Sequence, residues 1–176
     1  MGKNSPENFS HPEDRIITTI VETPRGSRNK YKWNEKSGRL ELSKVLPQGM
    51  VFPYDFGFFP GTRAEDGDPL DVLILNEEPT FPGCQIECRL VGVILARQRD
   101  KDKKENTNHR LVAVAQASVV YGGVRELTDL QPAHLKQIED FFVNYQKVRD
   151  VEVDLMGRDD SPAAWKILEQ AAESRT

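Results

Sequence analysis

Short runs of β-branched and apolar residues, separated by turn residues, fill the chain as far as residue 117. Runs of this length between Gly, Pro and Asn are typical of β-strands. The segment NEKSG at 34–38 lies between two such runs and predicts a hairpin. Strands are therefore expected at 15–23, 29–33, 39–43, 50–59, 71–75, 86–96 and 110–117.

Helical periodicity begins only after these runs. Pro132 suits the first turn of a helix, where its missing N–H removes no hydrogen bond. Apolar residues follow at helical spacing, at Leu135, Ile138, Phe142, Tyr145 and Val148. A second helix is expected to begin with Ser161 as a cap followed by Pro162, with Trp165, Leu168 and Ala172 on one face. Many strands followed by two helices predict an α+β fold, mainly β, in which a small barrel carries appended helices.

The 176 residues contain no internal repeat or linker, so one domain over 1–176 is expected, with 1–14 as a flexible N-terminal segment. The first 15 residues are polar and do not resemble a signal peptide, and apolar runs are far shorter than a membrane span. The formal net charge of −4 argues against a general polyanion binder. Cys84 and Cys88 lie in one expected strand about 13 Å apart, too far to bridge. Free thiols and no signal peptide predict a cytoplasmic protein.

Three aspartates crowd the sequence AEDGDPLDVLIL at 64–75. Gly67 and Pro69 favour a turn, so Asp66, Asp68 and Asp71 can converge on one point. Converging carboxylates repel unless a cation neutralises them, and hard oxygen ligands suit Mg²⁺, Mn²⁺ or Ca²⁺. The alternative is a solvated acidic turn. An EF-hand is excluded because that loop needs glycine at its sixth position, where Asp71 stands.

Basic residues at intervals indicate an anionic ligand for such a metal site. Lys30, Lys44 and Arg110 are the candidates, although any of them alone would be an ordinary surface residue. Multivalent cations together with Lys and Arg are typical of phosphoryl transfer. The polar segment 97–110 carries six basic and three acidic residues. It is interpreted as a solvated hairpin loop, with a role in the site left open.

The segment DGDPLD at 66–71, followed by Val-Leu, resembles the D-[SG]-D-P-x-D signature of family I soluble inorganic pyrophosphatases. Further matches fall in the family's order and spacing: IVETP (20–24), NKYKW (29–33), FPYDFGFFPGT (52–62), PGCQIECRLVGV (82–93), LVAV (111–114) and FFVNYQK (141–147). The resemblance implies a five-stranded closed barrel of oligonucleotide-binding (OB) type with two helices of the C-terminal half packed outside. It also implies hydrolysis of pyrophosphate in a homohexamer, with Mg²⁺ as the cofactor and Mn²⁺ as the alternative ion.

The resemblance also implies roles for particular residues. Asp66, Asp71 and, through water, Glu22 match metal-binding positions. Asp68 matches the position that activates a water held between two metals. Lys30, Lys44, Arg110 and Tyr145 match substrate-binding positions, with lysine replacing an arginine at 44 and arginine replacing a lysine at 110.

Other positions depart from the family. Two metal-binding aspartates are expected where Gln98 and Asn108 stand, and Asp100 or Asp102 could substitute for them. The remaining departures are Lys32 for an acidic residue, Phe52 and Phe56 for tyrosines, and Gln146 for a lysine.

These departures leave three functional hypotheses. Inorganic pyrophosphatase activity is favoured, with metals that bind more weakly where carboxylates are lost. The alternative is a pyrophosphatase-like protein with weak or lost activity that binds or hydrolyses another phosphorylated ligand. A nucleic-acid binder that stacks bases on the alternating aromatic residues 52–58 is disfavoured by the acidic charge.

Overall fold

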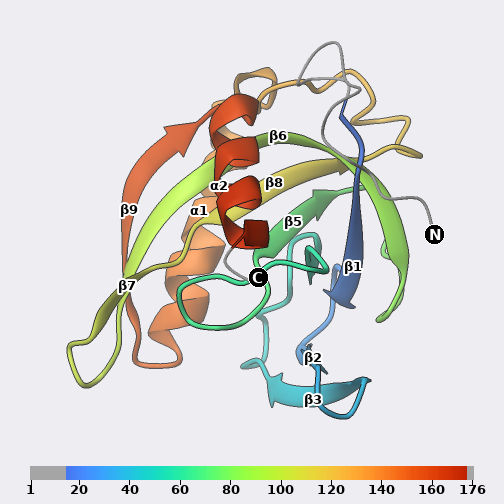
Figure 1. The fold of residues 1–176 in the computed structure, drawn as a ribbon. Helices are drawn as coiled ribbons and strands as arrows, with labels where there is room; N and C mark the ends of the chain where they lie inside the picture. Colours follow the sequence, from blue (N-terminus) through green and yellow to red (C-terminus); the bar gives the residue numbers. More distant parts are fainter. Residues whose placement is uncertain (1–14, 174–176) are drawn as a thin grey trace.

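The computed structural model describes residues 15–173, so the segment predicted to be flexible, 1–14, lies outside the described residues. Figure 1 shows a curved sheet flanked by two helices. In chain order the elements are β1 (Ile17–Thr23), β2 (Asn29–Asn34), β3 (Arg39–Val45), β4 (Asp55–Phe58), β5 (Asp71–Leu75), β6 (Gln85–Arg99), β7 (Glu105–Thr107), β8 (Arg110–Ala115), the 3₁₀ turn η3 (Leu127–Asp129), α1 (Pro132–Lys147), β9 (Glu152–Asp159) and α2 (Ser161–Glu173).

The main sheet has the strand order β1-β4-β5-β8-β6-β7, with β9 paired to β6. Strand β1 also pairs with β6, through Ile17 opposite Cys88, so the pairing of β1, β4, β5, β8 and β6 runs in a ring. Strands β5 and β8 are parallel and the other ladders are antiparallel. Strands β2 and β3 form a separate two-stranded sheet.

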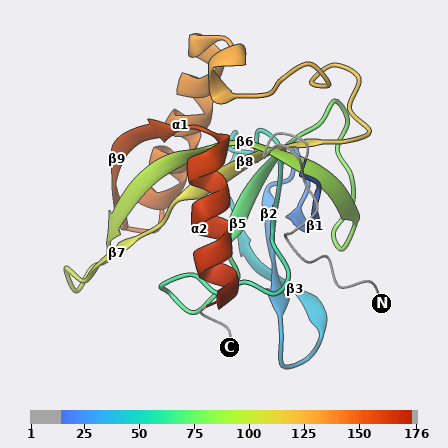
Figure 2. The same cartoon turned by 45° about the horizontal axis from the view of Figure 1, so that its top comes forward.

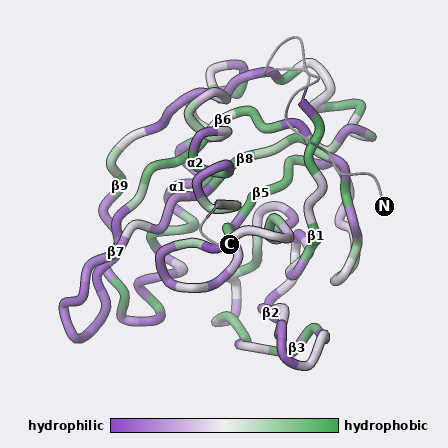
Figure 3. The backbone as a smooth tube through the Cα atoms, in the orientation of Figure 1, coloured by the Kyte–Doolittle hydropathy of each residue, from purple (hydrophilic) through white to green (hydrophobic). Residues whose placement is uncertain are grey.

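Alternation along β5 divides the core in two, because successive side chains of a strand point to opposite faces. Leu73 and Leu75 belong to an apolar cluster that includes residues of α1. Val72 and Ile74 belong to a second cluster that includes residues of α2. The turned view of Figure 2 shows α2 lying across β6. In Figure 3 hydrophobic residues follow the central strands, and hydrophilic residues fill the turn between β6 and β7.

The strand expected at 50–59 covers only Asp55–Phe58. Pro53 has no N–H to donate to a ladder, and the backbone of Phe52 is bonded elsewhere. Its N–H donates to the Ser27 carbonyl at 3.2 Å and its carbonyl accepts from Gly26 at 2.8 Å. Strand β9 was not expected from the sequence. Part of the expected 97–110 loop is strand, because β6 continues to Arg99 and pairs with β7.

Both predicted helices are present, with three corrections in their details. Val148 follows α1 and is 51% exposed, so it does not share the buried face. Ser161 does not cap α2 through its side chain, because its Oγ donates to the Leu90 carbonyl at 2.9 Å. Asp160 Oδ1 instead accepts from the N–H of Ala163 at 3.1 Å, and Ala171 rather than Ala172 is buried. No helix within residues 15–173 is long and apolar enough to cross a membrane.

Candidate active site

A cavity of about 170 Å³ brings together residues from both sheets, α1 and the loop before β5. It is lined by every residue that the sequence analysis proposed for the site and by every position that departs from the family. These are Glu22, Lys30, Lys32, Lys44, Phe52, Phe56, Asp66, Asp68, Asp71, Gln98, Asn108, Arg110, Tyr145 and Gln146. Among the described residues, Asp100 and Asp102 do not line this cavity; they lie in the turn between β6 and β7.

The acidic loop is held by its own hydrogen bonds. Thr62 Oγ1 donates to the Phe59 carbonyl at 2.7 Å and accepts from the N–H of Leu70 at 2.9 Å. Asp66 Oδ1 accepts from the N–H of Asp68 at 3.0 Å. Gly67 has φ +85°, a left-handed conformation that glycine adopts without strain. The turn predicted from Gly67 therefore forms, and it presents the aspartates to the cavity.

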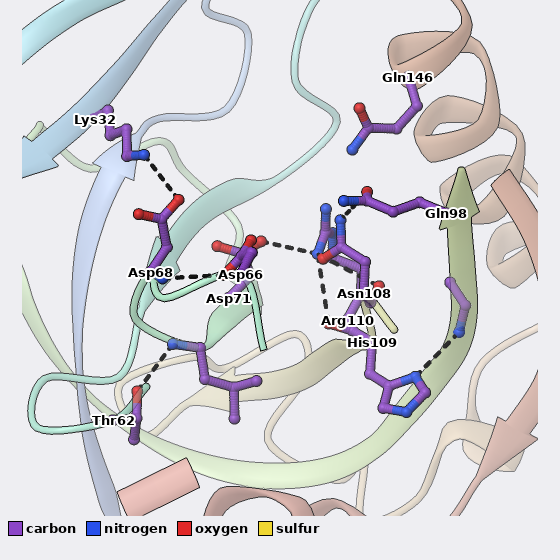
Figure 4. A network of polar contacts seen from close by, with 12 residues as sticks. Lys32, Thr62, Asp66, Asp68, Asp71, Gln98, Asn108, His109, Arg110 and Gln146 are labelled. Carbon is purple, nitrogen blue, oxygen red and sulfur yellow. Dashed lines mark hydrogen bonds and ion pairs between the residues drawn. The ribbon is translucent and has the colours of Figure 1, made fainter. Parts of the chain in front are cut away.

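Two of the three aspartates are paired with cationic side chains of the chain itself. Asp68 Oδ2 lies 2.8 Å from Lys32 Nζ, and Asp71 Oδ2 lies 2.8 Å from an amino nitrogen of Arg110. Figure 4 shows Asp68 directed toward Lys32, whereas Asp66 and Asp71 lie on the side of Arg110. Within residues 15–173, no three acidic, His or Cys side chains are arranged to hold one metal ion together. The expected convergence on a single point is thus replaced here by pairing with Lys32 and Arg110.

The carboxylates nevertheless form a strongly acidic wall. Burial raises the pKa of Asp66, and the charges of Asp68 and Asp71 raise it further, against a hydrogen bond from Asp68. Carboxylates that repel in this way favour a bound cation, and carboxylate oxygens are the ligands that Mg²⁺ and Mn²⁺ prefer. The donor set of this wall therefore fits a divalent metal ion.

Glu22 belongs to the same wall and is held near the end of β1. Its side chain is 7% exposed, and its Oε1 accepts from the N–H of Trp33 at 2.7 Å. Burial raises the pKa of Glu22 to about 7, although the bond from Trp33 opposes the shift, and the charge of Asp71 adds to it. A carboxyl with this pKa releases its proton readily near neutral pH when a cation approaches.

Beside these acids lies a polar network without carboxylates. Asn108 Nδ2 donates to Gln98 Oε1, and Arg110 donates to Asn108 Oδ1 (Figure 4). The guanidinium carbon of Arg110 lies 5.8 Å from the ring centroid of Phe56 and 5.4 Å from that of Phe142. Arg110 is only 6% exposed, so it holds a positive charge in a fixed position beside Asn108 and these two rings.

The opposite wall is basic and aromatic. Lys30 and Lys44 face each other across the β2–β3 ladder. Lys30 Nζ lies 5.7 Å from the Phe56 centroid and 5.6 Å from the Tyr145 centroid. Phe52 packs between these rings, with its centroid 5.7 Å from Phe56 and 5.6 Å from Tyr145.

Six lining residues were not proposed for the site from the sequence: Trp33, Ser43, Phe58, Pro69, Phe142 and Arg149. Trp33 and Phe142 lie inside segments that match the family, but neither is charged or part of a polar motif, so nothing in the sequence pointed to a place in the site. Arg149 follows Tyr145 by four residues, a helical spacing that could have pointed to a shared face. Arg149 lies beyond the end of α1, where helical spacing does not predict which side chains share a face.

Comparisons with known proteins agree with this geometry. A family model described as inorganic pyrophosphatase matches residues 19–176. The chain is 32% identical to the inorganic pyrophosphatase of Methanosarcina mazei over 93% of this chain and 94% of that protein. It is 34% identical to that of Geobacillus stearothermophilus over 92% of this chain and 90% of the relative.

Solved structures give the same result at the level of the fold. The inorganic pyrophosphatase of Thermus thermophilus superposes with a TM-score of 0.84 and 29% identity, covering 99% of this chain and 94% of that one. A crystal structure described as an inorganic phosphatase from Anaplasma phagocytophilum gives a TM-score of 0.84 and 31% identity, covering 99% and 96%. The likeness thus extends over nearly the whole chain.

Proposed function

Because this chain belongs to the inorganic pyrophosphatase family, we propose that the cavity between the acidic and basic walls is its active site. Enzymes of this family hydrolyse pyrophosphate to two phosphates with a divalent metal cofactor. One observation carries this proposal. The residues at all of the matched family positions line the same cavity, although Glu22 and Tyr145 are more than 120 residues apart in the chain. The cavity thus combines carboxylates with lysine and arginine side chains, the two kinds of charge that a metal–phosphate substrate requires.

The acidic wall supplies the metal ligands and the base. Asp66, Asp71 and Glu22 provide oxygens for the cation, and Mg²⁺ is the ion we propose, with Mn²⁺ as a substitute. When bound, the divalent cation acts as a Lewis acid toward the substrate oxygens and the attacking water. Asp68, whose side chain is half exposed and pairs with Lys32, accepts the proton of that water on a carboxylate oxygen.

The basic wall binds the substrate. Lys30 and Lys44 of this wall, together with Arg110 beside the acids, neutralise phosphoryl oxygens, and the hydroxyl of Tyr145 donates to one of them. This hydroxyl is buried and has no hydrogen-bond partner within the described residues, which supports a ligand contact. Phe52 and Phe56 close the wall with apolar surface and hold the rings that flank Lys30.

The test is phosphate release from pyrophosphate, titrated with Mg²⁺, in the wild-type protein and in Asp68→Asn. General base catalysis contributes typically 10²–10⁴-fold, so we expect the variant to lose at least about 100-fold in kcat. Asp102→Asn, an exposed aspartate outside the cavity, is the matched control and should keep full activity.

Equal activity of Asp68→Asn and wild type would refute the assignment of Asp68. Cleavage of nucleoside triphosphates or polyphosphate in place of pyrophosphate would favour the alternative substrate, since Phe52 and Phe56 make the cavity wall apolar.

Three further features belong to this proposal. The ring of paired strands supports a closed five-stranded barrel of OB type. Resemblance to bacterial members of this length supports a homohexamer. The free thiols of Cys84 and Cys88 support a reducing compartment, the cytoplasm.

A further inference from the structure

The basic end of the cavity holds more positive charge than the chain neutralises. Lys30 and Lys44 stand directly opposite each other in the β2–β3 ladder, an arrangement of like charges that costs free energy. Arg149 lines the same cavity. Burial lowers the pKa of Lys44, and the charges of Arg149 and Lys30 lower it further. Within residues 15–173, none of these three cations forms an ion pair with a carboxylate.

Arg149 is held in a defined position at this end. Its backbone N–H donates to the Gln146 carbonyl at 2.9 Å, just beyond the end of α1. One of its terminal nitrogens donates to Gln146 Oε1, also at 2.9 Å. Its guanidinium carbon lies 5.8 Å from the ring centroid of Tyr145. Gln146 is only 3% exposed, so it offers a fixed acceptor to the guanidinium.

Two buried hydrogen-bond donors at this end of the cavity remain unused. Arg149 Nε and the Tyr145 hydroxyl are both buried, and neither has a hydrogen-bond partner within the described residues. Buried polar atoms in proteins are almost always bonded, so an unused pair marks a place for an acceptor. The surrounding charge requires that acceptor to be anionic, and Arg matches phosphoryl oxygens with several donors at once.

We propose that Arg149 binds a phosphoryl oxygen of the substrate or of the phosphate product beside Tyr145, and that Gln146 is a positioning residue that orients its guanidinium. The proposal rests on the proposed function of the cavity. The positive charge missing at position 146, where the family has lysine, is then supplied three residues further along the chain.

The first experiment measures KM and kcat for pyrophosphate in Arg149→Ala, Arg149→Gln, Gln146→Ala and the control Lys147→Ala. Charge-assisted hydrogen bonds of about 1.5–3 kcal/mol correspond to roughly a 10- to 150-fold change, so KM should rise at least about tenfold in both Arg149 variants. Gln146→Ala should raise KM by a smaller factor and leave kcat nearly unchanged. Lys147 is exposed and does not line the cavity, so its loss should leave both constants unchanged.

Adding Gln146→Lys to Arg149→Ala should lower KM again, because a lysine there returns a cation to the same end of the cavity. Thermal unfolding of each variant checks the fold, and Arg149→Gln retains a long polar side chain if the alanine variant is unstable. An unchanged KM in folded Arg149→Gln would overturn the proposal.

The second experiment measures binding of inorganic phosphate by calorimetry in the presence of Mg²⁺. Arg149→Gln should weaken the Kd for phosphate at least about tenfold, whereas Lys147→Ala should not. Phosphate release by the wild-type protein tests the function separately. If the wild type releases none, the proposed function fails, and the phosphate titration alone decides the role of Arg149. Equal Kd values in Arg149→Gln and wild type would refute that role.

Discussion

Glu22 is buried and also lies in a site that attracts cations. Burial favours the protonated form of its carboxyl, whereas a nearby cation favours the ionised form. Burial raises its pKa from 4.5 to about 7, so the folded chain holds this proton more tightly than the unfolded chain. A raised pKa gives a contribution to stability that is fully present below pH 4.5 and is lost as the pH rises through 7. The ionised form therefore weakens the metal-free fold, although it is the form that our proposal requires of Glu22 as a metal ligand.

Glu22→Gln should remove this pH dependence. In chelator, the variant should be more stable than wild type by roughly 3 kcal/mol above pH 8, and the difference should vanish near pH 4. Glutamine can keep the bond from Trp33, so the change isolates the charge. Urea unfolding across this pH range measures the difference, with exposed Glu35→Gln as the control. A difference that is the same at pH 5 and pH 8 would contradict the assignment.

Residue types at the site could be predicted from motif spacing, whereas their partners could not. The turn expected from Gly67 and Pro69 is present, and Asp66, Asp68 and Asp71 line one cavity. Nothing local links Asp68 to Lys32 or Asp71 to Arg110, because each pair is formed across sheets or neighbouring strands. The uncharged network of Gln98 and Asn108 likewise depends on the ladder that brings β6 next to β8.

At the level of elements, β1 and β4 approach unusually closely at Gly57. A Cβ built there would lie 2.1 Å from the Ile20 carbonyl oxygen and 2.9 Å from its carbon. Both are backbone atoms, so neither can move without breaking the ladder between the two strands. The glycine thus allows the strand that carries Glu22 to lie against β4.

Gly57→Ala should destabilise the protein by roughly 3 kcal/mol or more, because the backbone must shift to admit the methyl group. Gly123→Ala is the matched control, since no atom lies within 4 Å of its added Cβ, and it should cost less than about 0.5 kcal/mol. Urea unfolding gives both values. Equal stability of the two variants would show that β1 and β4 separate without cost.

Elements with strong local signals were predicted well. Strand β5 matches the expected 71–75, and α1 begins at the predicted Pro132. Strand β9 was missed because its sequence, EVDLMGRD, is mostly polar and exposed. It becomes a strand by pairing with the extended end of β6, and strand formation depends on such neighbours more than on intrinsic preference.

At the scale of the whole molecule, several large apolar side chains stay exposed in the single chain. Val119 is 89% exposed, Val120 69% and Phe81 65%. Exposed apolar residues that gather into patches favour association. The sequence predicted one domain, but no pattern in one chain defines the contacts between copies.

The homohexamer that we propose should sediment with the mass of six chains, and dilution over two orders of magnitude should leave this mass unchanged near micromolar concentration. The same experiment in high salt separates apolar association from ionic contacts, which salt screens. A monomer mass at every concentration would refute the hexamer.

The separate sheet formed by β2 and β3 brings the lysines of the cavity to the site as one element. The hairpin carries Lys30, Lys32 and Lys44, whereas the acids come from β1, from the loop before β5 and from the first residue of β5. Side chains tie the hairpin to β1, through Thr23 and Tyr31 and through Glu22 and Trp33. A substitution in this hairpin can accordingly act on both kinds of charge at once: on the lysines that it carries and, through Trp33 and Lys32, on Glu22 and Asp68.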